Sequence, residues 1–335
     1  MTDFISQAKL AKNEDRRAIP QDLRLQEMVK PAPGSKHIYE FIGTDSFANA
    51  WYDRQQYEVN AGRLEVPTLY EPIYSIVRDA NLPRNVTINA IGPGGVILEQ
   101  IKEGGEVKFA TVGESTKTAE ILHYGVGLEY SDDLVAFNEL WTVVVVERAV
   151  GKAYNALLNH LHFNPILTYS YASTNQTAAN TSGSTYVEDT MLTIEDAISN
   201  ARLDTSNPRP GPYVLLINGA KEGVVGKALT REVQQGLASQ SRSLDSIQAV
   251  ISYNGWSGTR GSKTVSYSGV TSSKAYLIDV SQKDMDFQSF MKKDLAEYGR
   301  QEDVSRFLLQ IVWDTRFGVY ANPLAAVEEI TLPSA

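Results

Sequence analysis

The feature that most constrains this chain is a stretch from Leu134 to Leu161 that has no proline and a single glycine, Gly151. Apolar side chains recur along it at steps of three and four residues, the spacing that gathers them on one face of a helix. They are Leu140, Val143, Val150, Tyr154, Leu157 and Leu161. The stretch therefore predicts one helix of about 30 residues, about 45 Å long.

The expected ends of this helix are also marked in the sequence. Ser131 is a favourable N-cap, and Asp132 and Asp133 suit the positive end of a helix dipole. Pro165 is expected to end the element, because proline lacks the N–H that a helix interior requires. The run Val143–Val146 has low helix propensity and leaves a strand as the local alternative, but the flanks and the length favour the helix.

Composition narrows the class of protein. The chain has 335 residues, which suggests about two domains. The absence of cysteine excludes disulfides, thiolate metal sites and cysteine nucleophiles. The net charge of −9 argues against a reader of nucleic acid that binds phosphates through a basic face. No apolar run approaches the length of a membrane span, and residues 1–12 lack the apolar core of a signal peptide, so we expect a cytosol-like site of synthesis.

Residues 1–60 are predicted to form an arm rather than a domain. Prolines and a glycine at 31–34 interrupt it, and aromatic side chains then follow without a local core to receive them. Those singled out as candidate contacts are Phe41, Phe47, Trp51 and Tyr52. They are expected to pack either on another molecule or on the rest of their own domain.

A long two-stranded ribbon is predicted next. Residues 96–102 and 107–112 have strand character and flank a turn centred on Gly104 and Gly105, where glycine accepts a positive φ without strain. Glycine- and proline-rich segments bound the ribbon on both sides. An isolated ribbon is marginal in water, so this one needs a surface to lie on, within the chain or on a neighbour.

The remainder alternates between strands and helices. Strands are predicted at 121–130, 213–218, 247–253, 274–280, 304–319 and 325–332, helices at 190–203 and 219–235, and a polar turn or hairpin at 254–273. Residues 73–77 fit either a strand or a short helix. The predicted class is α+β.

No catalytic motif withstands inspection. Gly226-Lys227 resembles the end of a phosphate-binding loop, but Lys221 stands where its first glycine belongs and Ala228 where a hydroxyl should hold magnesium. His160 and His162 are two residues apart on the predicted helix and therefore point to different sides. We predict no enzyme activity, no cofactor and no metal site.

The order of elements resembles the major capsid proteins of tailed double-stranded DNA bacteriophages, the Hong Kong 97-like fold. The resemblance rests on the ribbon, the strand and the long helix between Val96 and Leu161. The tail Asp314–Val327 is similar to the closing strands of that family, where an arginine-containing strand turns at a proline.

The resemblance implies a fold with an N-terminal arm, an extended hairpin called the E-loop, a peripheral domain and an α/β axial domain. In the peripheral domain a long spine helix lies over an antiparallel sheet of long strands. The implied boundaries are 1–60 for the arm, 61–86 and 119–165 for the peripheral domain, 87–118 for the E-loop, 166–284 for the axial domain and 285–335 for the C-terminal peripheral strands. The implied subunit contacts of the E-loop are Glu99, Ile101, Lys102, Gly104, Gly105, Lys108 and Phe109.

The resemblance also implies partners. Many copies would form hexamers and pentamers of an icosahedral head around double-stranded DNA, assembled in the bacterial cytoplasm with portal and scaffolding proteins, and decoration proteins are left open. Only about 60 residues precede the recognisable part, so scaffolding is expected to be a separate protein. Lys102 and Lys108 resemble cross-linking lysines, but residues 305–307 lack the acceptor asparagine, so a non-covalent shell is expected. An encapsulin-like shell is the alternative, and a soluble α/β enzyme a remote one.

Overall fold

The structure is a computed structural model that describes residues 45–89, 116–131, 140–234, 244–260, 262–303 and 308–334. The chain divides into two compact units. The first comprises Met1–Leu64, Gly127–Gly151 and Gly299–Val312, and the second comprises Glu65–Val126, Lys152–Tyr298 and Trp313–Ala335.

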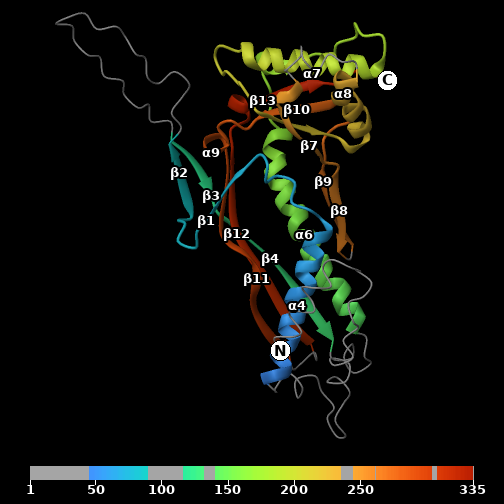
Figure 1. The fold of residues 1–335 in the computed structure, drawn as a ribbon. Coiled ribbons are helices and arrows are strands. Elements are labelled where there is room, and N and C mark those ends of the chain that lie inside the picture. The colour runs from blue at the N-terminus through green and yellow to red at the C-terminus, as the bar shows by residue number, and fades with distance from the viewer. Residues whose placement is uncertain are drawn as a thin grey trace, which may run out of the picture. The chain divides into compact units, whose positions relative to one another are not determined.

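Helices and strands alternate along the chain (Figure 1). The helices are α4 (Asp45–Glu65), α6 (Leu140–Leu167), α7 (Tyr186–Leu203), α8 (Glu222–Gln234) and the single turns α9 (Lys283–Asp286) and α10 (Pro323–Ala326). A four-stranded sheet has the order β1 (Ser75–Arg78), β11 (Phe287–Asp303), β12 (Leu308–Ala321), β4 (Leu122–Ser131). A five-stranded sheet has the order β5 (Gln176–Thr177), β13 (Val327–Thr331), β10 (Lys274–Asp279), β6 (Tyr213–Ile217), β7 (Ile247–Ser252). Two further pairs are β2 (Asn85–Asn89) with β3 (Thr116–Glu120) and β8 (Gly255–Arg260) with β9 (Lys263–Ser268).

The five-stranded sheet is covered on both faces, and this explains the unbroken apolar sequence of β6. Leu215 and Ile217 face a cluster that includes Ile198 of α7 and Val225 of α8. Val214 and Leu216 face the opposite cluster, which includes Phe163 near the end of α6. A strand buried on both faces needs apolar residues at every position rather than at alternate ones.

The predicted long helix is present as α6, with 28 residues and the valine run inside it. The prediction that Pro165 ends it is wrong, because α6 continues to Leu167. Proline removes only its own N–H this close to the end, and the burial of Ile166, which is fully shielded from solvent, holds the last turn in place. The expected first turns at 134–139 lie outside the described residues, and Ser131 belongs to β4.

Of the C-terminal strands, β11 differs from expectation. The 17-residue strand β11 covers Phe287–Asp303, where no strand was predicted, because charged residues at 292–294 break its apolar alternation. Residues 325–332, which the resemblance grouped with the C-terminal strands, contain β13. This strand pairs antiparallel with β10 and parallel with β5, so it lies inside the five-stranded sheet.

In the first unit, α4 crosses α6 at close range. A methyl group on Gly62 of α4 would overlap the carbonyl of Arg148, and one on Gly151 of α6 would overlap the carbonyl of Val59. Arg148 also donates to Glu58 across the crossing, with 2.6 Å between Nε and Oε2. The sequence predicted only an arm to residue 60, whereas residues 45–65 are helical and their C-terminal part packs on the same chain.

We expect Gly151→Ala to destabilise the first unit by about 1–3 kcal/mol, because the added methyl group would push the two helix backbones apart. The measurement is the free energy of unfolding in urea. Gly226→Ala on α8 is the matched control, since a methyl group there meets nothing within 4 Å. The control should gain about 0.5–1 kcal/mol from helix propensity. Equal effects of the two substitutions would contradict the close crossing.

Candidate functional site

The side chain of His162 is part of the core. Its ring is fully buried and stacks on Tyr70, with 3.7 Å between ring centroids. Its ring nitrogens lie 2.6 Å from the carbonyl oxygen of Leu158 and 2.9 Å from the hydroxyl of Ser289. Burial lowers the pKa of His162 to about 3, so the ring stays neutral and does not act as a general acid near neutral pH.

The other described histidines have structural partners as well. His160 stacks on Tyr267 with 4.3 Å between ring centroids, and His123 contacts the buried carboxylate of Asp314 at 3.1 Å. Within the described ranges, His, Asp and Glu side chains do not gather into a group of three that would hold a metal ion. Nor does any helix there combine the length and apolar character needed to cross a bilayer.

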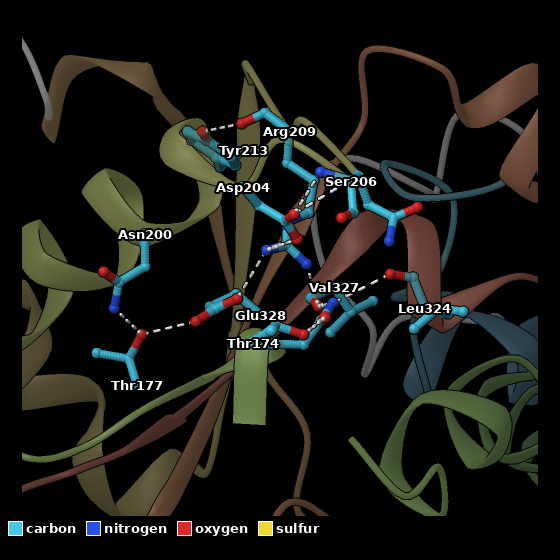
Figure 2. Close-up of polar contacts among 12 residues, drawn as sticks. Thr174, Thr177, Asn200, Asp204, Ser206, Arg209, Tyr213, Leu324, Val327 and Glu328 are labelled. Atoms are coloured by element: carbon cyan, nitrogen blue, oxygen red, sulfur yellow. Dashed lines mark hydrogen bonds and ion pairs between the residues drawn. The ribbon is translucent and has the colours of Figure 1, made fainter. Parts of the chain in front are cut away.

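Arg209 is a fully buried charged group of the second unit, with 1% of its surface exposed. Its guanidinium forms ion pairs with Glu328 of β13, at 3.0 Å, and with Asp204 after α7, at 3.3 Å. It also donates to the carbonyl oxygen of Val327 at 3.2 Å. Figure 2 shows these contacts converging from the end of α7, the segment before β6 and the start of β13.

The remaining oxygen of Glu328 is satisfied from the other side. Thr177 of β5 donates to it at 2.7 Å, and Asn200 of α7 donates to the Thr177 hydroxyl at 3.0 Å (Figure 2). Burial raises the pKa of Glu328, while Thr177 and Arg209 oppose that rise. The contacts tie β13 to β5 and to the segment before β6, and they tie both of these to α7, so the cluster is a structural lock.

This lock was not predicted from the sequence. Its sequence signal is an arginine between Pro208 and Pro210, just before a strand that is apolar throughout. An arginine held there by two restricted neighbours has little freedom, but the partner carboxylate lies more than a hundred residues away. Periodicity and spacing carry no information about such a pairing.

The predicted ribbon has a described root. β2 and β3 pair antiparallel from Asn85 with Glu120 to Asn89 with Thr116, so they bring together the two ends of residues 90–115. Ile88, Ala119 and Ile121 at this root pack with Phe290 of β11 and Tyr320 of β12. The root is therefore anchored on the second unit through an apolar cluster.

A polar chain reinforces the anchor. Lys117 of β3 donates to the side-chain oxygen of Asn322 at 3.4 Å, and the amide nitrogen of Asn322 donates to Asp286 at 3.0 Å. Arg84 and Glu120 add an ion pair at 2.8 Å, which is exposed and contributes little. Both strands of the root are thus tied to the body of the unit.

The polar segment 254–273 forms the expected hairpin, β8–β9. Tyr267 of β9 stacks on Trp256 of β8, with 5.6 Å between centroids, and on His160 of α6. Thr259 and Thr264 face each other at 3.1 Å on the exposed side. The hairpin therefore has one aromatic side that contacts α6 and one hydroxyl-rich side in solvent.

The structure does not describe the side chain of any of the predicted subunit-contact residues. Phe41 and the ribbon residues lie outside the described part of the chain, and Phe47, Trp51 and Tyr52 lie on α4 where only the backbone is described. The ribbon residues in question are Glu99, Ile101, Lys102, Gly104, Gly105, Lys108 and Phe109. Their roles as contacts stay predictions.

No protein-family model and no curated protein matches the sequence. Solved structures do match. The mature capsid of bacteriophage PhiM1 matches with a TM-score of 0.54 at 11% identity, over 80% of this chain and 88% of that one. The capsid of Myoviridae phage XM1 matches with a TM-score of 0.52 at 12% identity, over 79% and 91% of the two chains. The capsid of the native GTA particle matches with a TM-score of 0.52 at 11% identity, over 80% and 90%.

These matches establish the class of fold. The chain is a mixed helix-and-sheet protein with the fold of phage capsid proteins, and the similarity spans most of both chains in each comparison. The resemblance to the major capsid proteins of tailed phages is confirmed at the level of the fold.

We expect Arg209→Ala to destabilise the second unit by about 3–5 kcal/mol, because it leaves Glu328 and Asp204 buried without their cation. The matched control is Lys274→Ala, which breaks the part-exposed pair with Glu329 (2.8 Å) and should cost about 1 kcal/mol or less. Urea unfolding measures both. A loss for Arg209→Ala no larger than that of the control would show that the lock is not stabilising.

Proposed function

We propose that this protein is the major capsid subunit of a tailed-phage head, which self-assembles into hexamers and pentamers of an icosahedral shell around double-stranded DNA. The observation that carries the proposal is the shared fold, which extends over about four fifths of this chain and about nine tenths of the phage capsid chains. A similarity of that extent concerns the whole subunit rather than one inserted domain. The proposed role is structural, without catalysis.

The elements have proposed roles within that subunit. The helix α6 would be the spine helix, the sheet β1–β11–β12–β4 the peripheral sheet, and the five-stranded sheet with α7 and α8 the axial domain. Residues 87–118, which leave from the root of β2 and β3, would be the E-loop. The axial domain would then comprise 166–284 together with β13.

The mechanism of assembly follows from the ribbon. A two-stranded ribbon lacks enough apolar contacts to be stable alone, so it gains most by lying on a neighbouring copy. Repeated around a closed ring, this makes each subunit incomplete without the next one. The anchored root matters here because a ribbon that leaves from a fixed base reaches the same place on every neighbour.

The charge of the chain is compatible with a DNA container. With a net charge of −9, a shell wall made of this protein would not hold DNA by phosphate contacts, so a packaging motor could compress the genome against it. We propose a location in the virion, after assembly in the host cytoplasm. Portal and scaffolding proteins would be the partners, decoration proteins are left open, and the shell would be non-covalent.

The test of the ribbon is replacement of Glu99–Lys108 by a glycine–serine segment of equal length. This keeps the chain length and removes the side chains proposed to contact the neighbour. We expect a subunit with the wild-type urea midpoint that no longer forms particles in electron micrographs. The matched control exchanges the exposed Thr259 and Thr264 of β8–β9 for serine, which keeps the hydroxyl groups, and should assemble.

The outcomes separate the parts of the proposal. Normal shells from the ribbon variant would overturn the role of the ribbon, and a wild-type protein that stays monomeric at all concentrations and with scaffolding would overturn the capsid function. The contents of purified particles distinguish a phage head from an encapsulin-like shell. Packaged DNA supports a phage head, whereas an enzyme cargo without DNA would identify the encapsulin-like alternative.

A further inference from the structure

The contact between α4 and α6 in the first unit has a polar interior. Gln55 and Glu58 of α4 are 2% and 3% exposed, and Glu147 of α6 is 2% exposed. Three polar side chains are thus buried where two helices cross at glycines. Helix contacts of this kind are normally apolar, because burial of a charge is costly unless it is paired.

We call Gln55, Glu58 and Glu147 the polar seam between α4 and α6. Its two carboxylates differ in their partners. Glu58 is paired with Arg148 at 2.6 Å. Glu147 forms no ion pair within the described part of the chain, and its hydrogen bond comes from the hydroxyl of Tyr130 at 3.4 Å, which is long. Glu147 is therefore the buried acid of the seam that has no ion pair among the described residues.

The amide of Gln55 adds a second unmatched group. Its oxygen accepts from Arg300 of β11 at 2.8 Å. Its nitrogen is buried and reaches no partner of normal hydrogen-bond geometry among the described residues, although Gln55 lies close enough to lower the pKa of Glu147. The surroundings of the Glu147 carboxyl group therefore provide too few hydrogen bonds and charges to stabilise it fully as an anion.

We propose that Glu147 is a proton-operated latch between α4 and α6: uptake of a proton by its carboxyl group strengthens the docking of α4, and release of the proton weakens it. The latch is a property of the subunit and stands independently of the proposed capsid function. Its consequence is that α4 is held tightly in acid and loosely in base.

The electrostatics of the seam support the latch. Burial, the largest cause, raises the pKa of Glu147 from 4.5 to about 7. Arg54 of α4 opposes this rise and Glu58 of α4 adds to it, while Tyr130 of β4 opposes it through its hydrogen bond. Arg300 of β11 acts on Tyr130, and Arg148 of α6 is engaged by Glu58.

The sign and size of the effect follow from linkage. A carboxyl group whose pKa is higher in the docked state binds its proton more tightly there, so docking is strongest below the ordinary value and weakens as the pH rises through about 7. Each unit of pKa difference is a tenfold change. Between pH 5 and pH 8 the equilibrium constant for docking should fall about 70-fold. The largest fall that this difference in pKa allows, over the whole pH range, is about 300-fold.

Hydrogen exchange of the full-length protein tests the latch. Protection factors of the amides of residues 54–65, corrected for the intrinsic effect of pH on exchange, are measured from pH 5 to pH 8. We expect a fall of about 70-fold in the wild type. In Glu147→Gln, which cannot release a proton, protection should vary less than about threefold across the same range. The matched control is Glu129→Gln in the same unit, whose carboxylate is exposed and accepts from Gln310 at 2.9 Å.

Each outcome decides the proposal. A pH-dependent fall in the wild type and in Glu129→Gln, absent from Glu147→Gln, supports it. Protection that is independent of pH in the wild type, or the same fall in Glu147→Gln, overturns it. If Glu147→Gln does not fold, the carboxyl carbon of Glu147 in the wild type is titrated by NMR, and a pKa near its ordinary value of 4.5 overturns the latch.

Discussion

The second unit depends on the interior position of its C-terminal strand. β13 lies between β5 and β10 in the five-stranded sheet. It is the last of the five strands in the sequence, so the other four precede it along the chain. Four of its five residues are buried, and one of these is Glu328. A carboxylate brought into the middle of a sheet requires a cation, and Arg209 supplies it from the segment before β6. The lock is therefore a consequence of the strand order.

The helix α6 meets two kinds of surface along its length. Its C-terminal half carries Phe163 and Ile166 into the apolar core beside β6, where contacts are permanent because water is excluded. Its N-terminal half meets α4 through Gly151 and a polar seam. Contacts of the second kind respond to charge.

An element can be predicted from the sequence when the residues that determine it lie close together in the chain. The strand Tyr213–Ile217, the hairpin at 254–273 and the helix α7 were predicted because propensity and periodicity are local. The strand β11 was missed because its charges are compensated from other elements: Lys293 by Asp314 of β12, and Asp294 by the hydroxyl of Tyr154. Gly151 was noticed as the lone glycine of a helix, but its purpose is visible only beside Gly62.

The sequence by itself determined the class of fold, the long helix, the apolar strand of the five-stranded sheet and the absence of familiar catalytic motifs, since these depend on residues close together in the chain. Tertiary structure alone decided that β13 enters the five-stranded sheet, that Arg209 faces Glu328, and that α4 docks at Gly151 beside Glu147, which has no ion pair in the part of the chain that the structure describes. The physical reason is that the energy of a buried charge or of a close helix crossing belongs to pairs of residues, and the partner of each pair is set by the folded chain.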